Sequence, residues 1–350
     1  MQDGAYFCVM QVAILGASGY AGGELIRLLD AHPGFTPTHL GAHTQAGKTL
    51  AEVHPHLDGG DRVLGPNDPE VLPDETDLVF LALPHGASAE IGVELVDAGI
   101  SVVDLGSDFR LDTHERYLLA YGSEHPYPHR LADWVYGLPE LFDVSGASAV
   151  ASPGCYPTSA IVGLAPIIAS HLVDPTAITV NAVSGVTGAG RKLADQFLFG
   201  SIAEGVVAYG VGTHRHRPEM EMALEASSGV DSVNVTFTPH LVPMQRGIVA
   251  TATAPVGHAV ERSEVLDVLR DAYAGRPFVE VVEDPPQSRW TVGSNKVLVT
   301  AYVDTHSDSI IVVSALDNLV KGAAGQAVQA ANLMTGQPES TGLPLSGWLP

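Results

Sequence analysis

Over the first 150 residues, short apolar runs alternate with segments whose apolar residues recur at helical spacing. The apolar runs end at glycine, proline or polar residues, as buried strands do. They fall at residues 11–16, 38–42, 77–83 and 101–104. Helices are expected directly after the first run and at residues 87–98. Strands that alternate with helices predict a doubly wound parallel sheet with helices on both faces.

The pattern changes after residue 155, where longer runs of alternating apolar and polar residues predict a mixed sheet with helices packed on it. A helix is expected at residues 159–170, and an Ala-rich helix at 318–334 is expected to return to the first sheet. The predicted strands are 178–183, 232–237, 248–254, 297–303 and 310–315. The last two are expected to be antiparallel across a turn at Ser307-Asp308. We therefore divide the chain into a nucleotide-binding domain, residues 1–154 with 316–350, and a catalytic and oligomerisation domain, residues 155–315.

Composition narrows the class of protein. The apolar runs are too short to cross a membrane, and the segment before Met10 has no basic stretch, so we expect a cytoplasmic enzyme with no signal peptide. The formal net charge of -23 disfavours nucleic acid and anionic membranes as partners. The two cysteines, Cys8 and Cys155, form neither a disulfide framework nor a CxxC pair.

A glycine-rich loop joins the first predicted strand to the first helix. It reads Gly16-Ala-Ser-Gly-Tyr-Ala-Gly22, a GxxGxxG spacing. Glycines there allow backbone N–H groups and the helix N-terminus to approach a pyrophosphate, although an ordinary strand–helix turn is the simpler alternative. The predicted cofactor-binding residues of this loop are Gly16, Ser18, Gly19, Tyr20, Ala21 and Gly22.

The residues after the second strand bear on the choice between NAD and NADP. NAD enzymes commonly place an acidic residue about 20 positions after the loop, where it binds the ribose hydroxyls. Here no acid occurs between Asp30 and Glu52, whereas Thr44 and Lys48 lie in that stretch. An acid would repel a 2′-phosphate, so we expect NADP(H) as cofactor, unless this loop is merely polar surface.

Cys155 lies in the segment Ser152-Pro-Gly-Cys-Tyr-Pro-Thr158, after a short strand at 149–151 and before a helix. Pro157 suits a first helical turn. A cysteine at a helix N-terminus is stabilised as thiolate, and nearby N–H groups can hold an oxyanion, so Cys155 is the candidate nucleophile. The alternative is a buried structural cysteine. Cys8 lacks this setting and is expected to be incidental.

Two histidines and two arginines occur together in the segment Thr213-His-Arg-His-Arg-Pro-Glu219. One histidine is expected to be the acid/base partner of the thiol. If the segment is extended, His214 and His216 share one face. Glu219 is expected to orient an imidazolium or to contact substrate. The alternatives are a surface loop, or a metal site, for which no third ligand is evident.

Other candidate residues follow strand ends or glycine-rich turns. Arg110 follows the strand at 101–104 and is expected to hold a phosphate. Arg191, expected to bind substrate, closes a second glycine-rich loop that begins with Ser184 and Gly185, which are expected to contact the cofactor. This loop is equally compatible with a plain turn. Asn318 opens the last helix and is expected to contact the cofactor, with an N-cap role as the alternative.

Taken together, these motifs resemble the N-acetyl-γ-glutamyl-phosphate reductase family. The matching stretches, in chain order, are GASGYAGGELIRLL (16–29), LALPHG (81–86), DFRL (108–111), YGLPE (136–140), SPGCYPT (152–158), VSGVTGAGR (183–191), THRHRPEM (213–220) and DNLVKGAAGQAVQ (317–329). Val186 and Thr187 depart slightly from the expected pattern.

The resemblance implies a Rossmann domain, an α/β catalytic domain, NADPH as cofactor and a small-molecule acyl phosphate as substrate. It implies that Cys155 is the nucleophile and His216 the acid/base, with His214 less favoured, that Pro84 and Gly86 contact the cofactor, and that the protein is a homotetramer. The rival activities are aspartate-semialdehyde dehydrogenase and a reductase of carrier-protein-bound acyl phosphates, which an acidic surface disfavours. A catalytically inactive NADP-binding regulator is a rival from another class.

Overall fold

A computed structural model describes residues 9–191 and 194–348 and contains two seven-stranded sheets. The first has the order β3-β2-β1-β4-β5-β7-β6, and every pair in it is parallel. Its strands are β1 (Met10–Leu15), β2 (Phe35–Ala42), β3 (Gly65–Pro66), β4 (Leu78–Leu81), β5 (Ser101–Asp104), β6 (Val135–Tyr136) and β7 (Ala149–Ala151). The predicted parallel sheet is therefore confirmed.

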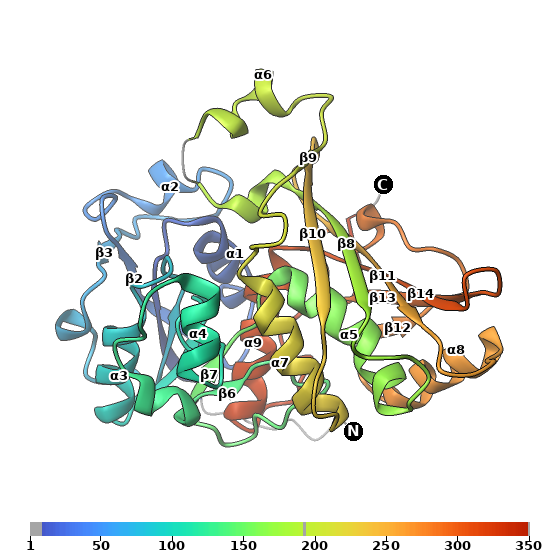
Figure 1. The fold of residues 1–350 in the computed structure, drawn as a ribbon. Helices are drawn as coiled ribbons and strands as arrows, with labels where there is room; N and C mark the ends of the chain where they lie inside the picture. The colour runs from blue at the N-terminus through green and yellow to red at the C-terminus, as the bar shows by residue number, and fades with distance from the viewer. Residues whose placement is uncertain (1–8, 192–193, 349–350) are drawn as a thin grey trace, which may run out of the picture.

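Helices cover both faces of this sheet, as expected for strands that are buried on both sides. One face packs on α1 (Tyr20–Leu29) and on α9 (Gly325–Met334), which returns from the end of the chain. The other packs on α3 (Ala89–Asp97). Figure 1 shows α9 in red beside the blue and green elements of the first half. The remaining helical segments here are α2 (Leu50–Val53), η1 (Pro69–Val71), α4 (His114–Tyr121) and η2 (Pro128–Asp133).

The second sheet is mixed and has the order β12-β13-β14-β11-β8-β10-β9. Strands β8 and β10 are parallel, whereas β13 and β14 are antiparallel, as the turn at Ser307-Asp308 predicted. Its strands are β8 (Ile178–Gly185), β9 (Val207–Ala208), β10 (Val235–Val242), β11 (Ile248–Pro255), β12 (Val279–Val281), β13 (Val297–Asp304) and β14 (Ser309–Leu316).

One face of the mixed sheet is covered by α5 (Cys155–Ala169), α7 (His216–Ser228) and α8 (Arg262–Ala272), which share its apolar core. A segment containing α6 (Phe199–Ile202) projects from the top of the molecule in Figure 1. Short turns complete this half: η3 (Val186–Ala189), η4 (Asp195–Phe197), η5 (Ser288–Trp290) and the π-helical turn η6 (Val320–Ala324). In the described part of the chain, no helix has the length and apolar character that a membrane crossing needs.

Several predicted boundaries were wrong, and two of them have a clear local cause. The helix expected at 159–170 begins four positions earlier, at Cys155, because Pro157 falls in the first turn, where a missing N–H costs no hydrogen bond. The strand expected at 232–237 runs instead as β10, through Pro239. Proline is tolerated there because its only outer neighbour is the two-residue edge strand β9, which pairs with His240 and Leu241.

Candidate active site

The chain turns sharply between β7 and α5, and Cys155 is the first residue of that helix. Gly154 is the N-cap and has no side chain with which to cap the helix. Cys155 lines a pocket of about 170 Å³ together with Ser184, His214 and His216. The other lining residues are Tyr156, Gly188, Ala189, Phe197, Tyr209, Arg215 and Leu241. The structure thus brings together residues that the sequence predicted from three distant segments.

The pocket environment corrects the expected state of the thiol. Burial raises the pKa of Cys155 to about 11, although the charge of Arg110 and the N–H of Tyr156 act to lower it. The helix N-terminus alone predicted a lowered pKa, but the cost of desolvating a thiolate is larger here. At neutral pH the thiol of Cys155 is therefore protonated.

The two histidines do not lie on an extended strand. Arg215 has helical backbone angles and His216 is the first residue of α7, so the expected alternation of sides was wrong. Burial, together with the neighbouring His214 and the positive charges of Arg110 and Arg215, lowers the pKa of His216 well below its ordinary value. His216 is consequently neutral at neutral pH and able to accept a proton. Burial also lowers the pKa of His214, to about 4.

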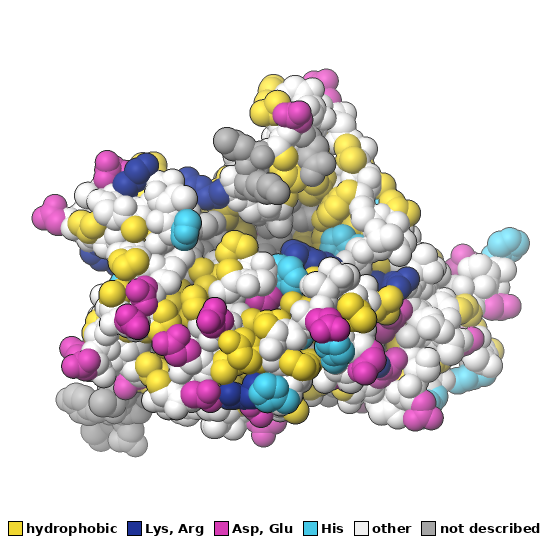
Figure 2. All heavy atoms as spheres, turned by 60° about the vertical axis from the view of Figure 1, so that its left-hand side comes forward, with side chains coloured by type: hydrophobic (Ala, Val, Ile, Leu, Met, Phe, Trp, Pro, Cys, Tyr) yellow, Lys and Arg dark blue, Asp and Glu magenta, His cyan; other side chains and the backbone are white. Residues whose placement is uncertain are grey.

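Because the segment is helical, Arg215 lies on the pocket side with the histidines instead of pointing away from them. Arg215 is among the residues that line the pocket, whereas Arg110 and Arg191 are not. Both of these arginines donate hydrogen bonds to backbone carbonyl groups. Arg110 donates from Nη2 to the carbonyl oxygen of Leu105 at 2.8 Å. Arg191 donates to the carbonyl oxygen of Ser18 at 2.8 Å, beside the glycine-rich loop. Figure 2 shows basic and histidine side chains at the hollow below the projecting segment, on a face with many acidic residues.

Glu219 is buried and does not contact the imidazole of His216 through any hydrogen bond among the described residues. Its Oε1 accepts the N–H of Gly154 at 2.7 Å and the hydroxyl of Tyr136 at 3.0 Å. Its Oε2 lies 3.6 Å from Nη1 of Arg110. Glu219 therefore supports the backbone before Cys155, which is not the imidazolium-orienting role expected from the sequence.

The glycine-rich loop fits a dinucleotide pyrophosphate. Gly16 has φ +93°, and a Cβ there would lie 2.2 Å from the carbonyl oxygen of Ala82. A Cβ on Gly22 would lie 2.3 Å from the carbonyl oxygen of Gly16. Among the described residues no side chain caps α1, whose N-cap is Gly19, so the helix N-terminus faces the loop uncapped. The loop follows β1, next to β4, at the point where the strand order reverses and α/β proteins bind ligands.

Comparison with known proteins agrees with this geometry. Residues 11–147 match the family described as semialdehyde dehydrogenase, NAD binding domain, and residues 155–318 match semialdehyde dehydrogenase, dimerisation domain. An N-acetyl-gamma-glutamyl-phosphate reductase of Dehalococcoides mccartyi is 44% identical over 97% of this chain and 99% of its own length. One from Acidothermus cellulolyticus is 45% identical over the same shares. The chain belongs to the N-acetyl-gamma-glutamyl-phosphate reductase family.

Solved structures show that this fold is shared beyond the reductase family. The aspartate semialdehyde dehydrogenase II of Vibrio cholerae superposes with a TM-score of 0.72 at 21% identity, covering 94% of this chain and 99% of its own. An aspartate semialdehyde dehydrogenase from Candida albicans, solved with NADP, gives 0.65 at 19% identity and covers 93% and 98%. At such identities the likeness concerns the fold alone.

The residues predicted to bind the cofactor outside the glycine-rich loop lie near the ends of β2, β4, β8 and β14. Gly86, after β4, has φ +83° and donates its N–H to Asp108 at 2.8 Å, and Pro84 precedes it in the same loop. Thr44 and Lys48 are exposed after β2. Gly185 ends β8 beside Ser184, which lines the pocket.

Asn318 bridges two loops of the second half of the chain. It accepts the N–H of Gly247 at 2.7 Å and donates to the hydroxyl of Thr187 at 3.0 Å. The capping role belongs to its neighbour Asp317, which accepts the N–H of Leu319. Cys8 lies outside the described residues.

The reductase family motifs did not reveal Tyr209, a pocket residue, although they include its partner Tyr156 in the SPGCYPT stretch. Tyr209 donates its hydroxyl to that of Tyr156 at 3.0 Å, and both line the pocket. The two residues are 53 positions apart, and Tyr209 lies in a segment without regular periodicity, so nothing local in the sequence indicated the contact.

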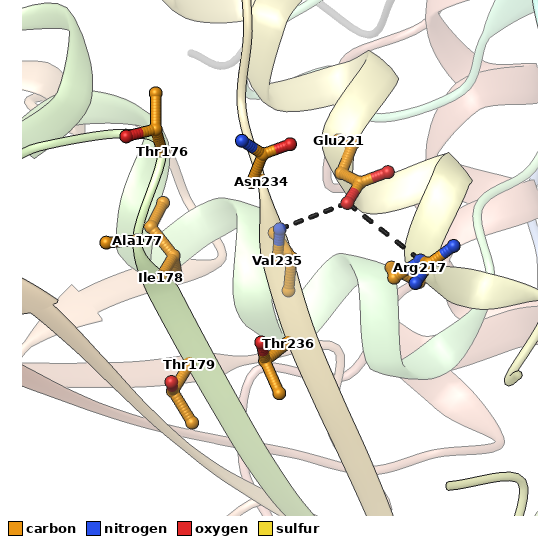
Figure 3. A pocket seen from close by; sticks show the side chains of 9 residues that line it. All are labelled: Thr176, Ala177, Ile178, Thr179, Arg217, Glu221, Asn234, Val235 and Thr236. Carbon is orange, nitrogen blue, oxygen red and sulfur yellow. Dashed lines mark hydrogen bonds and ion pairs between the residues drawn. The ribbon is translucent and has the colours of Figure 1, made fainter. Parts of the chain in front are cut away.

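A larger, open pocket of about 570 Å³ lies between the start of β8, the start of β10 and α7 (Figure 3). Its charged groups already have partners, because Glu221 accepts the N–H of Val235 at 3.0 Å and lies 3.9 Å from Arg217. None of the described residues that line it is a predicted catalytic residue, so we place the active site at the smaller pocket. The described residues also include no group of three or more His, Cys, Asp or Glu arranged to hold a metal ion.

Proposed function

We propose that this enzyme reduces N-acetyl-γ-glutamyl phosphate with NADPH to N-acetylglutamate 5-semialdehyde and phosphate, a step of arginine biosynthesis. The names of its relatives support this substrate. The observation that carries the proposal is that Cys155, at the start of α5, lines the same pocket as the neutral base His216. A thiol beside a base is the arrangement that covalent catalysis on an acyl group requires.

In the first half of the reaction, Cys155 forms a thioester. His216 accepts the thiol proton while Sγ attacks the γ-acyl carbon, the acyl–oxygen bond breaks and phosphate leaves. Arg215 lines the pocket and is the cation placed to neutralise the departing phosphate. Arg110 acts from behind Gly154, where its charge favours the thiolate that forms during attack.

In the second half, the thioester is reduced and released. The nicotinamide, when bound, supplies the hydride that adds to the thioester carbon. The resulting oxyanion collapses to the aldehyde as the carbon–sulfur bond breaks, and the imidazolium of His216 donates its proton to the departing sulfur, so the thiol is regenerated. Backbone N–H groups at the start of α5 stabilise the oxyanion. His216 is preferred to His214 because its Nε2 lies beside Gly154, 2.7 Å from the position that a Cβ there would occupy.

Each of the two sheets belongs to a domain with its own function. Residues 1–154 with 316–350 hold the nucleotide, and residues 155–315 supply the nucleophile and the contacts between copies. NADPH is the preferred cofactor because Thr44 and Lys48 follow β2 in a stretch without carboxylates. The face of the mixed sheet opposite α5 and α8 carries apolar side chains that support contacts in a homo-oligomer. They are half-buried and point away from the core: Val183, Val249, Ile311 and Val313.

The deciding experiment is the reverse reaction, with NADP, phosphate and either N-acetylglutamate semialdehyde or aspartate semialdehyde. We expect phosphate-dependent NADP reduction, with kcat/KM for N-acetylglutamate semialdehyde at least about 100-fold higher, because a site that hydrogen-bonds an acetamido group would leave its polar groups unpaired with the other substrate. A preference for aspartate semialdehyde, or activity with neither, would contradict the proposal.

A further inference from the structure

Three buried side chains from separate elements meet behind the nucleophile. Tyr136 ends β6, Arg110 follows β5, and Glu219 lies in the first turn of α7. All three are at most 8% exposed. The sequence separates Tyr136 from Glu219 by 83 positions, so only the tertiary fold brings them into contact.

Glu219 connects Tyr136 to the backbone before Cys155 through a single carboxylate oxygen. Its Oε1 accepts both the hydroxyl of Tyr136 at 3.0 Å and the N–H of Gly154 at 2.7 Å. Gly154 is the N-cap of α5, and a Cβ on it would lie 3.0 Å from Nη1 of Arg110. The backbone that presents Sγ is therefore held between the carboxylate and the guanidinium.

The two charges of the cluster act on the sulfur in opposite directions. Arg110 favours the thiolate, and Glu219 disfavours it. The hydroxyl hydrogen of Tyr136 points at Oε1 and partly neutralises the carboxylate. Without it, the carboxylate would act more strongly on the sulfur and would draw Arg110, now 3.6 Å from Oε2, toward itself.

We infer that Tyr136 is a positioning residue of the reductase: through Glu219 it fixes the N-cap of Cys155 and the balance between carboxylate and guanidinium that activates the thiol. The inference rests on the proposed role of Cys155 as nucleophile. Tyr136 is not among the residues that line the pocket, and its hydroxyl is bonded to Glu219, so its effect on Cys155 passes through Glu219 and Gly154.

The test measures alkylation of Cys155 by iodoacetamide at pH 8, followed by peptide mass spectrometry in a Cys8→Ser background. Tyr136→Phe should slow alkylation roughly threefold, since a thiol pKa raised by up to about one unit lowers the thiolate fraction while part of the loss is offset by higher nucleophilicity. Glu219→Gln, which keeps the acceptor oxygen and removes the charge, should accelerate alkylation. The effect of Tyr136→Phe should largely vanish in the Glu219→Gln background.

Tyr273→Phe is the matched control, because its buried hydroxyl donates to the carbonyl oxygen of Val162 at 2.7 Å, within the apolar core of the mixed sheet. It should reduce thermal stability without changing the alkylation rate of Cys155.

The inference is overturned if Cys155 in Tyr136→Phe is alkylated at the wild-type rate or faster, or if the effect of Tyr136→Phe persists unchanged in the Glu219→Gln background. Should Tyr136→Phe fail to fold, a Glu219→Gln variant that alkylates no faster than wild type overturns it instead. Because alkylation needs no turnover, these results stand apart from the reductase assay.

Discussion

The imidazole rings of His214 and His216 lie 4.7 Å apart between centroids, and Nδ1 of His214 accepts the backbone N–H of His216 at 3.2 Å. His214 thus binds a free N–H in the first turn of α7, as a capping side chain does. His216 instead directs Nε2 toward Gly154, next to Cys155. Two histidines of one motif therefore have different tasks.

The histidine variants should separate these tasks. His216→Asn should lower kcat by about 100-fold or more, as is typical for loss of an acid/base group. His214→Asn should have a much smaller effect, because asparagine also accepts a hydrogen bond at a helix start. The assignment is reversed if His214→Asn is the variant that loses activity.

The same residues predict the acid limb of the pH–rate profile. The proposed base must be neutral, and the pKa of His216 is lowered by burial and by neighbouring positive charge. The base form therefore persists as pH falls below about 6.5, the ordinary value for histidine. We expect kcat/KM of the free enzyme to decline only below that pH, and a decline centred at or above it would contradict the burial of His216.

Substitution of the nucleophile should abolish turnover. Cys155→Ser should retain little activity, because a hydroxyl is a far weaker nucleophile at neutral pH. Since the pKa of Cys155 is raised to about 11, its alkylation rate should climb roughly tenfold per pH unit from pH 7 to 9 without a plateau. Cys8→Ser should leave both measurements unchanged, and a plateau near pH 7 would show that the thiolate is already formed at rest.

A single carboxylate after β2 should weaken NADPH binding. Thr44→Asp would place a negative charge where the 2′-phosphate is expected, so KM for NADPH should rise by about tenfold while KM for NADH changes little. Thr305→Asp, on the exposed turn between β13 and β14, is the control with the same change of charge. Equal kcat/KM with NADPH and NADH in the unaltered enzyme would refute the preference.

Replacing Gly16 with alanine should cost more stability than replacing Gly99, a glycine with a similar φ angle. Gly99 has φ +83°, but no atom lies within 4 Å of the position that a Cβ there would occupy, so Gly99→Ala should cost only about 1–2 kcal/mol of unfolding free energy. Gly16→Ala adds overlap with the carbonyl oxygen of Ala82, so it should cost more and weaken NADPH binding. Chemical denaturation and cofactor titration of both variants test this, and equal losses would rule out the proposed close approach.

Local chemistry in the sequence determined much of this molecule. Apolar runs of strand length predicted the parallel sheet, glycines after β1 predicted the tight turn at Gly16, and the strand–turn–helix around Cys155 predicted its place at a helix start. Each of these depends on neighbours within a few positions. Backbone sterics and periodic burial act over that range, so the sequence is sufficient for them.

Only the tertiary structure decided the electrostatics of the site. The thiol pKa depends on burial and on charges supplied by Arg110 and Glu219, which are 45 and 64 positions from Cys155. The side of the pocket taken by Arg215 depended on α7 beginning at His216, and the contact between Tyr136 and Glu219 depended on β6 reaching α7. Desolvation and Coulomb interactions sum over everything that surrounds a group in space, and no local pattern carries that sum.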